Sequence, residues 1–329
     1  MEIRNFNVTK DNILEMVNLW NEVVSERGFY KPHTPESMER LLFNSPEFSS
    51  EGAFGAYVNG RLIGFSCGII RKAELENPEA VGYVNAVVVK KEYRNQGVGK
   101  ALLESVENYF KKHNKKAARC VFLDPVNYPW YIPNTDKHDH PGCPAVPINS
   151  PEYFFLLHND YKVEGFIDAF HLPLDEYQMP QSVVEKIKEN EAKGIKIELY
   201  DASRHYGLEE FYQNIQNPSF ERAIRSNLAL EKPNPFLVVS VDNKVVGWTG
   251  AMYTEESGRA HFDGIVIDST IRGGGVGKAL FCTLCQYSKE HGSKFMTFFT
   301  GLENPARNIY LFAGFKIIQS FAIMKKGLR

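Results

Sequence analysis

Two copies of one glycine-rich segment are the residues of this chain best suited to bind a charged group. The run G-V-G-K-A-L at 97–102 recurs letter for letter at 275–280, and an arginine stands three residues before each copy. Each run follows a β-branched stretch and precedes an amphipathic helical pattern. Glycines let the backbone approach a phosphate closely, and N–H groups at a helix start point toward it. The spacing therefore predicts two phosphate-binding turns, each between a strand and a helix.

Two other phosphate-binding motifs do not fit this spacing. A Walker A loop places Ser or Thr after its lysine to bind magnesium, but Ala101 and Ala279 stand there. A dinucleotide-binding fold places G-x-G-x-x-G directly after the first strand of a βαβ unit. Here the glycines follow four predicted strands, which excludes that arrangement.

The surroundings of the two turns match at an offset of 275 − 97 = 178 residues. Each copy begins with an amphipathic strand, continues through a helical region into a hairpin, and has a further strand after the helix. The hairpins turn at Asn59-Gly60 and at Asp242-Asn243, residue pairs that tolerate the positive φ of tight turns. The strand predictions are 2–8, 55–58, 62–70 and 120–123 in the first copy, and 195–200, 236–241, 245–252 and 295–299 in the second. The pattern predicts a duplicated domain.

The copies differ in the length that follows the turn. An aromatic residue expected between a helix and a strand stands at Tyr161 and at Phe315, an offset of 315 − 161 = 154. The first copy therefore has 178 − 154 = 24 extra residues, which we place near 124–150, a segment rich in Pro, His and Asp. A loop of this length is typical of a lid, a binding loop or a disordered segment. We expect domains at 1–174 and 195–329, joined by a linker with a short charged helix at 175–194.

Composition limits the classes of partner. With 38 basic and 40 acidic residues the net charge is −2, so the chain has no global electrostatic footprint for nucleic acid or an anionic membrane. The N-terminus lacks the apolar core of a signal peptide, and no apolar run reaches the ~18 residues of a spanning helix. Five cysteines spread through the chain do not suggest a disulfide framework. We expect a cytoplasmic protein.

The strand order and the R-x-x-G-x-G turns together resemble the GNAT superfamily of acyl-CoA N-acyltransferases, over nearly the whole chain and as two tandem copies. The resemblance implies an α/β (α+β) fold with two mixed, mostly antiparallel sheets flanked by helices. It implies that strands four and five splay apart to admit the pantetheine arm, and that acetyl-CoA is the co-substrate. No metal is implied.

By this resemblance, strand four and the glycine turn of each copy bind coenzyme A. In the second copy these residues are Ile265, Val266, Ile267, Arg272, Gly273, Gly274, Gly275, Val276, Gly277, Lys278 and Asn304; in the first they are Val87, Val88, Val89, Arg94, Asn95, Gln96, Gly97, Val98, Gly99 and Lys100. For the arginines and lysines the alternative is ordinary surface charge at a helix start.

The resemblance places the chemistry in the second copy. A tyrosine four residues before a glycine commonly protonates the departing sulfur in this family, and Tyr310 precedes Gly314 by four. The matching residue of the first copy is Leu156. Family members often place a base on strand four, where counting back from the turn gives His261 and Asp263. Ordinary polar lining of a strand end is the alternative for this pair.

Two cysteine-containing clusters are interpreted as non-metal features. His138, Asp139, His140 and Cys143 lie within six residues but lack a separated second pair of ligands, so we expect a surface or lid loop. Cys282 and Cys285 lie in a predicted helix where the first copy has Glu104 and Glu107. We expect the glutamates on a solvated face and the cysteines on a face buried against the other domain or a second chain.

The expected function is an N-acetyltransferase that moves acetyl from acetyl-CoA to a primary amine by direct transfer in the C-terminal domain. The acceptor is a small-molecule or peptide amine that the sequence does not identify, with no nucleic-acid or membrane partner. A homodimer is left open. The alternatives are a non-enzymatic acyl-CoA-binding regulator or scaffold, and an aminoacyl-tRNA-dependent peptidyltransferase.

Overall fold

The computed structural model describes residues 1–121 and 124–328 and divides them into two compact units. The first unit combines Met1–Asp168 with Gln319–Arg329, and the second comprises Ala169–Ile318. The boundaries expected at 174 and 195 assumed that each copy folds from one continuous segment. The units depart from that order because the last strand of the second copy ends in the first unit, and the last strand of the first copy runs from the first unit into the second.

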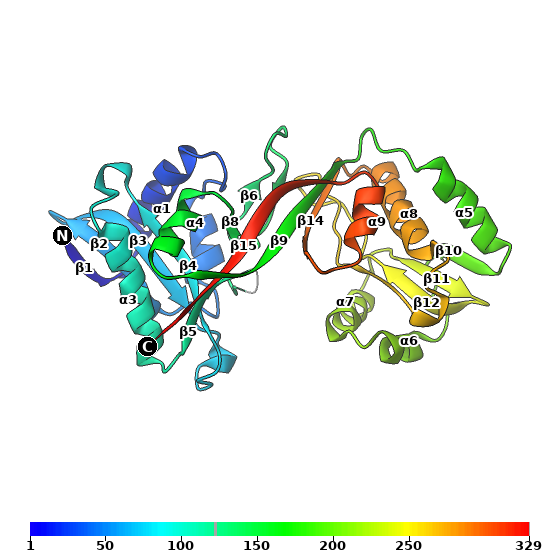
Figure 1. The fold of residues 1–329 in the computed structure, drawn as a ribbon, viewed down its shortest axis with the longest axis horizontal. Coiled ribbons are helices and arrows are strands. Elements are labelled where there is room, and N and C mark those ends of the chain that lie inside the picture. The colour runs from blue at the N-terminus through cyan, green and yellow to red at the C-terminus, as the bar shows by residue number, and fades with distance from the viewer. Residues whose placement is uncertain (122–123, 329) are drawn as a thin grey trace. The chain divides into compact units, whose positions relative to one another are not determined.

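The first unit is a mixed sheet between helices (Figure 1). Its elements are β1 (Glu2–Asn5), α1 (Lys10–Ser25), α2 (Pro35–Met38), β2 (Ala53–Val58), β3 (Arg61–Ile69), β4 (Gly82–Val89), α3 (Val98–Lys112), β5 (Ala117–Cys120), β6 (Trp130–Tyr131), β7 (Asp139–His140), β8 (Val146–Pro147), α4 (Pro151–His158) and most of β9 (Lys162–Pro173), with most of β15 (Lys316–Gly327). The strand order is β1-β2-β3-β4-β5-β15-β9, and the neighbours are antiparallel from β1 to β4. The predicted α/β class is confirmed.

The second unit repeats this plan. Its elements are α5 (Gln181–Glu191), β10 (Ile195–Leu199), α6 (Leu208–Ile215), α7 (Pro218–Leu228), β11 (Leu237–Val241), β12 (Lys244–Thr249), β13 (Ile265–Ile267), α8 (Val276–Glu290), β14 (Phe295–Gly301) and α9 (Arg307–Phe312). Four antiparallel strands follow in the order β10-β11-β12-β13, and β14 lies beside β9. Both predicted hairpin turns have positive φ, at Asn59-Gly60 and at Asp242-Asn243.

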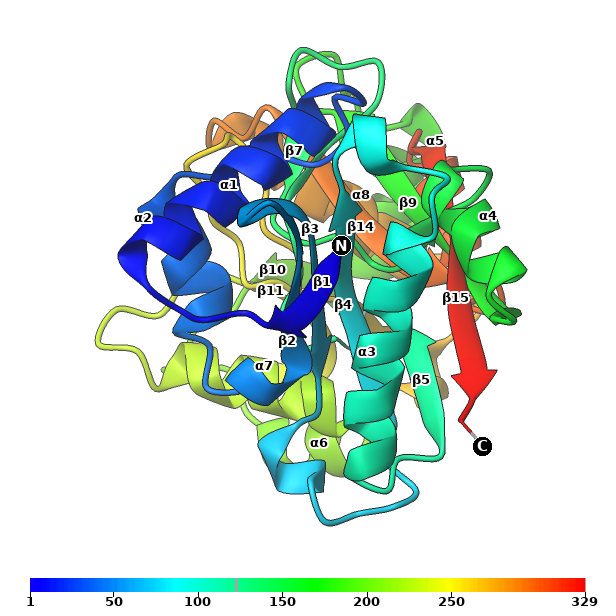
Figure 2. The same ribbon diagram turned by 90° about the vertical axis from the view of Figure 1, so that its left-hand side faces the viewer.

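Alternation along the strands gives each sheet two apolar faces. In the first unit α1 packs on the face that carries Leu62, and α3 packs on the opposite face, which carries Ile63 (Figure 2). In the second unit α8 lies on the face that carries Val239, and α6 with α7 lies on the face that carries Val238. Each sheet is therefore buried on both sides, and the glycine turns lie at the start of the helix on one face.

Strands four and five separate in both units. β4 pairs with β5 in parallel only at Gly82 and Tyr83, opposite Ala118 and Arg119. In the second unit a single parallel bridge joins Arg259 to Phe295. Within the described residues the remainder of β4 is free on that side, so a splay of the expected kind exists beside the first glycine turn.

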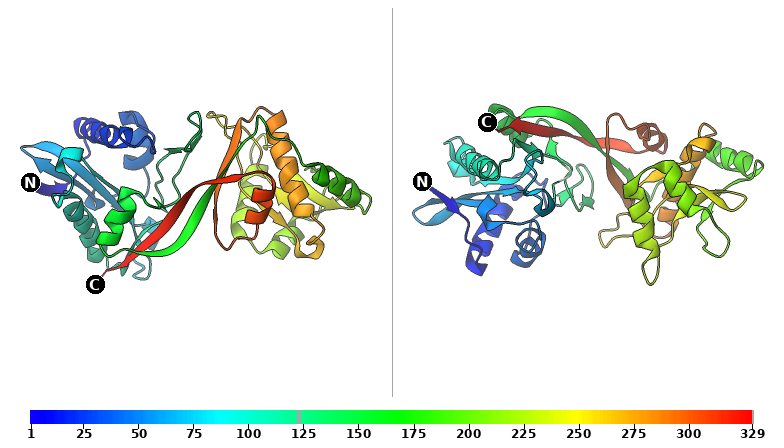
Figure 3. Two further views of the ribbon diagram at one scale, coloured as in Figure 1. Left: turned by 45° about the horizontal axis from the view of Figure 1, so that its top comes forward. Right: turned by 90° about the horizontal axis from the view of Figure 1, so that it is seen from below.

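The closing strands are exchanged between the copies. β15, from the second copy, pairs with β5 of the first unit from Met324 opposite Cys120 to Gly327 opposite Ala117. β9, from the first copy, lies beside β14 of the second unit. Both are twelve-residue strands that can be followed by colour in Figure 3. Met324 is buried in the core of the first unit and Phe170 in that of the second, so each core needs a residue from the other copy.

Two surface predictions for the helices need correction. The segment expected as a linker packs on α8 through Tyr177 and Val183, and it buries Cys282 and Cys285 completely. The same unit therefore covers the cysteine face, in place of the other domain or a second chain. In α3, Glu107 is buried where a solvated face was expected, because it forms an ion pair of 2.9 Å with Lys326 from β15.

Candidate active site

The two glycine turns have the same backbone conformation. Gly97 (φ +83°) and Gly275 (φ +74°) are the N-caps of α3 and α8, and neither helix start has a side-chain cap. Two residues earlier, Asn95 (φ +58°) and Gly273 (φ +97°) are also left-handed. Uncapped N–H groups at a helix start attract anions, and the left-handed residues turn the chain around that position. Both turns therefore fit a diphosphate.

The arginines before the turns tie each turn to strand four. Arg94 Nε donates to the carbonyl of Val89 at 3.0 Å, and Arg272 Nε donates to that of Ile267 at 3.1 Å. Arg94 also forms an ion pair at 2.8 Å with Glu26, the C-cap residue of α1. These contacts give the arginines a positioning role. Val98 is buried beneath the turn, and Gln96 bonds back to the carbonyl of Glu92.

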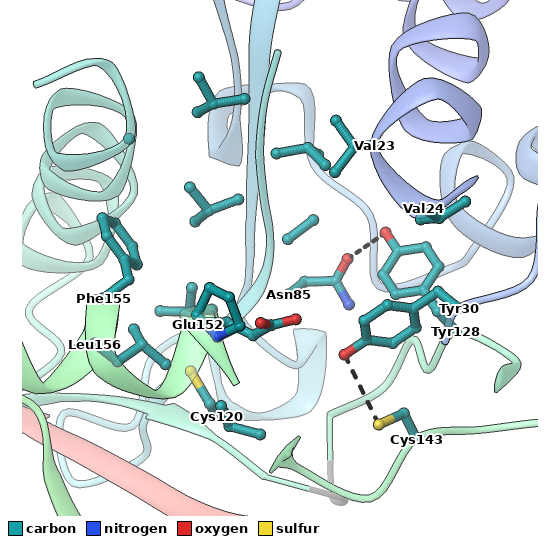
Figure 4. A pocket seen from close by; sticks show the side chains of 18 of the residues that line it. Val23, Val24, Tyr30, Asn85, Cys120, Tyr128, Cys143, Glu152, Phe155 and Leu156 are labelled. Atoms are coloured by element: carbon teal, nitrogen blue, oxygen red, sulfur yellow. Dashed lines mark hydrogen bonds between the residues drawn. The ribbon is translucent and has the colours of Figure 1, made fainter. Parts of the chain in front are cut away.

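A cavity of about 620 Å³ lies in the first unit, beside the splay of β4 and β5 (Figure 4). Its walls come from α1, β4, the glycine turn, the segment after β5, and α4. The lining residues are Trp20, Val23, Val24, Arg27, Tyr30, Val84, Asn85, Ala86, Val87, Val88, Val89, Arg94, Asn95, Gly97, Gly99, Lys100, Cys120, Val121, Asp124, Val126, Asn127, Tyr128, Cys143, Ala145, Val146, Pro151, Glu152, Phe155, Leu156, His158 and Asn159. The cavity thus brings together most first-copy residues predicted to bind coenzyme A with residues of the insertion.

A hydrogen-bonded polar cluster lies in this cavity. Tyr128 donates from its hydroxyl to Asn85 Oδ1 at 2.8 Å, and Asn85 Nδ2 donates to Asp124 Oδ1 at 3.2 Å. The N–H of Val126 donates to the same carboxylate oxygen at 3.0 Å. Burial raises the pKa of Asp124 to about 7. Asp124 and Tyr128 lie in the insertion, which has no counterpart in the second copy, so the repeat gave no signal that they are site residues.

Tyr310 and Leu156 hold equivalent positions. The N–H of Phe315 donates to the carbonyl of Tyr310 at 3.1 Å, and the N–H of Tyr161 donates to that of Leu156 at 3.1 Å. The residue before each aromatic is left-handed in both copies, which is the usual way to end a helix. The first cavity therefore has an apolar side chain where the second copy has a tyrosine.

The Tyr310 side chain is enclosed by aromatic rings. It is 5% exposed, and its ring lies 4.5 Å from Phe298, 5.7 Å from Phe170 and 6.2 Å from Phe262. Burial raises its pKa to about 12. Among the described residues its hydroxyl has no hydrogen-bond partner, so it is free to donate to a ligand.

His261 and Asp263 are joined in one cluster. His261 Nε2 lies 2.9 Å from Asp263 Oδ1, and its Nδ1 lies 3.2 Å from Glu255 Oε1. Arg259 pairs with Glu255 through its Nε at 2.8 Å, and the Tyr253 ring stacks on the imidazole at 4.2 Å. Burial alone would lower the pKa of His261, but the hydrogen bonds that its ring N–H groups donate to the two carboxylates outweigh burial and raise that pKa to about 9. At neutral pH His261 is therefore an imidazolium.

The segment that carries this cluster is irregular where a strand was expected. β13 includes only Ile265–Ile267, and Gly250 (φ +142°) and Gly264 (φ +148°) break the regular backbone on either side. The resulting loop brings Glu255 and Arg259 against His261. The expected strand at 245–252 likewise ends at Thr249.

A family model described as the acetyltransferase (GNAT) family matches residues 17–129 and 199–315. The chain belongs to the GNAT family. Each matched segment contains one glycine turn, so the tandem organisation that the repeat predicted is confirmed. No relative among curated proteins matches the sequence.

Solved GNAT structures share the fold across the whole chain. A GCN5-related N-acetyltransferase from Sphaerobacter thermophilus matches with a TM-score of 0.61 and 14% identity, covering 100% of this chain and 96% of that one. A tandem GNAT protein from the clavulanic acid biosynthesis pathway has a TM-score of 0.61 and 13% identity, with 100% and 99% covered. A fungal glucosamine N-acetyltransferase region within a multi-domain β-N-acetylglucosaminidase matches with a TM-score of 0.66 and 13% identity. This chain covers 38% of that protein.

The remaining predicted GNAT site residues are placed as follows. Asn304 accepts a hydrogen bond from the N–H of Ala306 at 3.0 Å, just before α9. Lys278 lies with its ammonium 4.3 Å above the Phe312 ring, and Lys100 lies 3.9 Å from Glu104. The stem of Lys186 from α5 lies beside Gly275, where a Cβ would meet it at 3.2 Å. The second turn is thus partly covered by α5, whereas a Cβ at Gly97 would meet nothing within 4 Å.

The cluster at 138–143 is held by protein contacts. Asp139 forms an ion pair with Lys31, and His140 Nδ1 lies 2.7 Å from the carbonyl of Gly142. Over residues 1–121 and 124–328 the structure has no group of three or more potential metal ligands. In the same ranges no helix has the length and apolar character needed to cross a bilayer.

Proposed function

We propose that this GNAT protein is an N-acetyltransferase that transfers acetyl directly from acetyl-CoA to a primary amine of a small molecule or peptide. The chemistry is assigned to the second unit. All five cysteines are free and buried, which fits a reducing compartment such as the cytoplasm.

The observation that carries this proposal is the environment of Tyr310. It is a buried tyrosine with an unpaired hydroxyl among the described residues, in contact with Phe262 of the strand-four segment. Phe262 stands between His261 and Asp263 in the chain, and those two side chains bond to each other. The segment therefore contacts the tyrosine through Phe262 and carries the histidine–carboxylate cluster on the two residues that flank it.

This arrangement supports a division of the two proton events. As the amine nitrogen forms its bond to the acetyl carbon, it loses a proton to the cluster of His261 and Asp263. As the carbon–sulfur bond breaks, Tyr310 gives its proton to the sulfur. A tyrosine whose pKa is raised to about 12 stays protonated until the thiolate forms. The products are an amide and a free thiol, and no covalent enzyme intermediate is needed.

The protonation state of the His261 and Asp263 cluster sets how the reaction rate depends on pH. Because the pKa of His261 is about 9, the imidazole accepts a proton only in alkaline solution, while Asp263 stays ionised because the hydrogen bond from His261 lowers the pKa of its carboxyl. At neutral pH the carboxylates are the proton acceptors and His261 orients them. If His261 is the base, the rate rises with pH up to about 9.

The test is Tyr310→Phe, with Tyr287→Phe as a matched control on α8, where the ring stacks on His291. Tyr310→Phe is expected to lower kcat for release of coenzyme A thiol by ~100-fold and to leave the KM for acetyl-CoA nearly unchanged. Tyr287→Phe is expected to leave both unchanged. A Tyr310→Phe protein with wild-type kcat contradicts the assigned role.

A further inference from the structure

The cavity of the first unit combines a phosphate-binding turn with the half-buried carboxylate of Asp124, although this copy lacks the tyrosine. We propose that it is a second acyl-transfer site, in which Asp124 from the insertion takes the proton of a cationic amine acceptor. This inference rests on the proposed use of acyl-CoA but not on Tyr310 or on chemistry in the second unit.

The cavity has the length for both substrates. All residues of β4 from Val84 to Val89 line the cavity. Val89 accepts the hydrogen bond from Arg94 before the turn, and Asn85 donates a hydrogen bond to Asp124. Four residues at about 3.3 Å each place these two ends about 13 Å apart. Beyond Tyr83 β4 is unpaired with β5 within the described residues, so the strand edge facing the cavity is free to bind a ligand. The turn and the carboxylate thus lie at opposite ends of one cleft.

Asp124 is a carboxyl in this cavity whose pKa is raised to about 7, and His158 of α4 is a further titratable group in the lining. The charged or titratable groups that influence it are Tyr128 of the insertion, Cys67 of β3, Cys120 of β5 and Arg71 after β3. Burial raises the pKa values of the two thiols and of the Tyr128 phenol, so these groups stay neutral. Arg71 opposes the effect of burial on Asp124 only weakly, and it pairs with Tyr83.

The other charges in the cavity define the acceptor class. Glu152 of α4 forms an ion pair with Arg27, which follows α1, so their charges cancel. The Asn85 amide and the backbone N–H of Val126 donate hydrogen bonds to the Asp124 carboxylate. Among the ion pairs of the described residues, none joins Asp124 to a cation. Apolar walls from Val23, Val24 and Trp20 complete the site. These features fit a primary ammonium on an apolar or aromatic body, and they disfavour an acceptor that carries a carboxylate.

The reaction balances without a protein acid. The bound ammonium first gives one proton to Asp124, which passes it to solvent. The neutral amine nitrogen then bonds to the acyl carbon of the thioester, and the proton that it loses to become an amide moves to Asp124. The carbon–sulfur bond breaks, and the thiolate leaves and takes a proton from water because Leu156 has none to give. Asp124 then returns its proton to solvent. This mechanism requires the aspartate to be ionised, so the rate rises with pH through about 7.

The experiment measures thiol release from acetyl-CoA with a panel of alkyl and aryl amines in a Tyr310→Phe background, in which only the first site retains its full set of groups. Asp124→Asn keeps an oxygen acceptor for Asn85 and removes the base; it is expected to lower the remaining rate by ~100-fold. Asp136→Asn, an exposed change in the same insertion, is the control and should have no effect. The remaining rate should rise with an apparent pKa near 7.

Each outcome supports or overturns one of the two claims. Loss of the remaining rate in Asp124→Asn, with the pH limb near 7, supports the second site. A remaining rate that Asp124→Asn leaves unchanged, or no amide formed by Tyr310→Phe with any amine, overturns it. If Tyr310→Phe alone has full activity and Asp124→Asn has none, the role of Tyr310 fails while this inference stands. Should Asp124→Asn not fold, the pH limb of the Tyr310→Phe protein decides alone: a limb near 9 or none overturns the proposal.

Discussion

Tyr310 of α9 and Leu156 of α4 each accept a hydrogen bond of 3.1 Å from the aromatic residue five positions further along the chain. This shared contact aligns the two helix ends independently of the glycine turns. It shows that the duplicated fold keeps its backbone where its side chains differ, since one copy has a phenol at this position and the other has a hydrocarbon. The two units are therefore expected to differ in how they handle the thiolate.

The glycine turns should bind two molecules of acetyl-CoA. Gly97→Trp and Gly275→Trp place a side chain at a left-handed residue, which strains the backbone by ~1–2 kcal/mol and fills the space for the diphosphate. Each variant is expected to bind one equivalent in calorimetry, with wild type binding two. Gly60→Trp is the control, because Gly60 has a similar φ of +76° in a hairpin turn away from both sites. Unchanged stoichiometry in Gly97→Trp would show that the first turn holds no ligand.

The His261 cluster should stabilise the fold in a pH-dependent way. Its pKa is raised from 6.5 to about 9, so the contribution is complete below pH ~6.5 and is lost as pH rises through 9. A shift of this size corresponds to ~3 kcal/mol at most. We expect the free energy of unfolding to fall between pH 7 and 10 in the wild type, and to fall less in His261→Gln. Equal slopes in urea titrations of both proteins would mean that His261 titrates in the native state as it does unfolded.

Because β15 pairs with the first unit, a substitution of Glu107 in α3 should reduce the stability of the fold. Glu107 is buried and pairs with Lys326 of β15, so Glu107→Ala leaves a charge without its partner and should cost ~3 kcal/mol of stability. Glu104→Ala, one turn earlier and exposed, should cost less than ~0.5 kcal/mol. If β15 remained with its own copy, the two variants would be equally stable in urea denaturation.

The cysteines should be protected in the native state. Cys282 and Cys285 have no exposed surface, and burial raises the pKa of both thiols. Reaction with a thiol reagent is expected only at the rate of unfolding, and rapid native alkylation of either cysteine would contradict the packing of α5 on α8.

Local signals in the sequence predicted the parts of the fold that are decided locally. The glycine turns and the Asn59-Gly60 hairpin depend on positive φ at residues that tolerate it, so the residue types themselves predicted the turns. The exchange of β9 and β15 could not be predicted, because both are alternating strands of similar length and nothing local states which sheet each joins. The charge of His261 depends on Glu255, which only the folded loop brings near. Asp124 lies in an insertion without a repeat partner, so no comparison between the copies could identify it.

The most direct test is to incubate the protein with acetyl-CoA and the amine panel, and to follow amide formation by mass spectrometry together with thiol release. The account predicts an acetylated amine formed in equal amount to the thiol, with both reduced in Tyr310→Phe. Binding of acetyl-CoA with no acetylated product from any amine would contradict the account and favour a protein that only binds the donor.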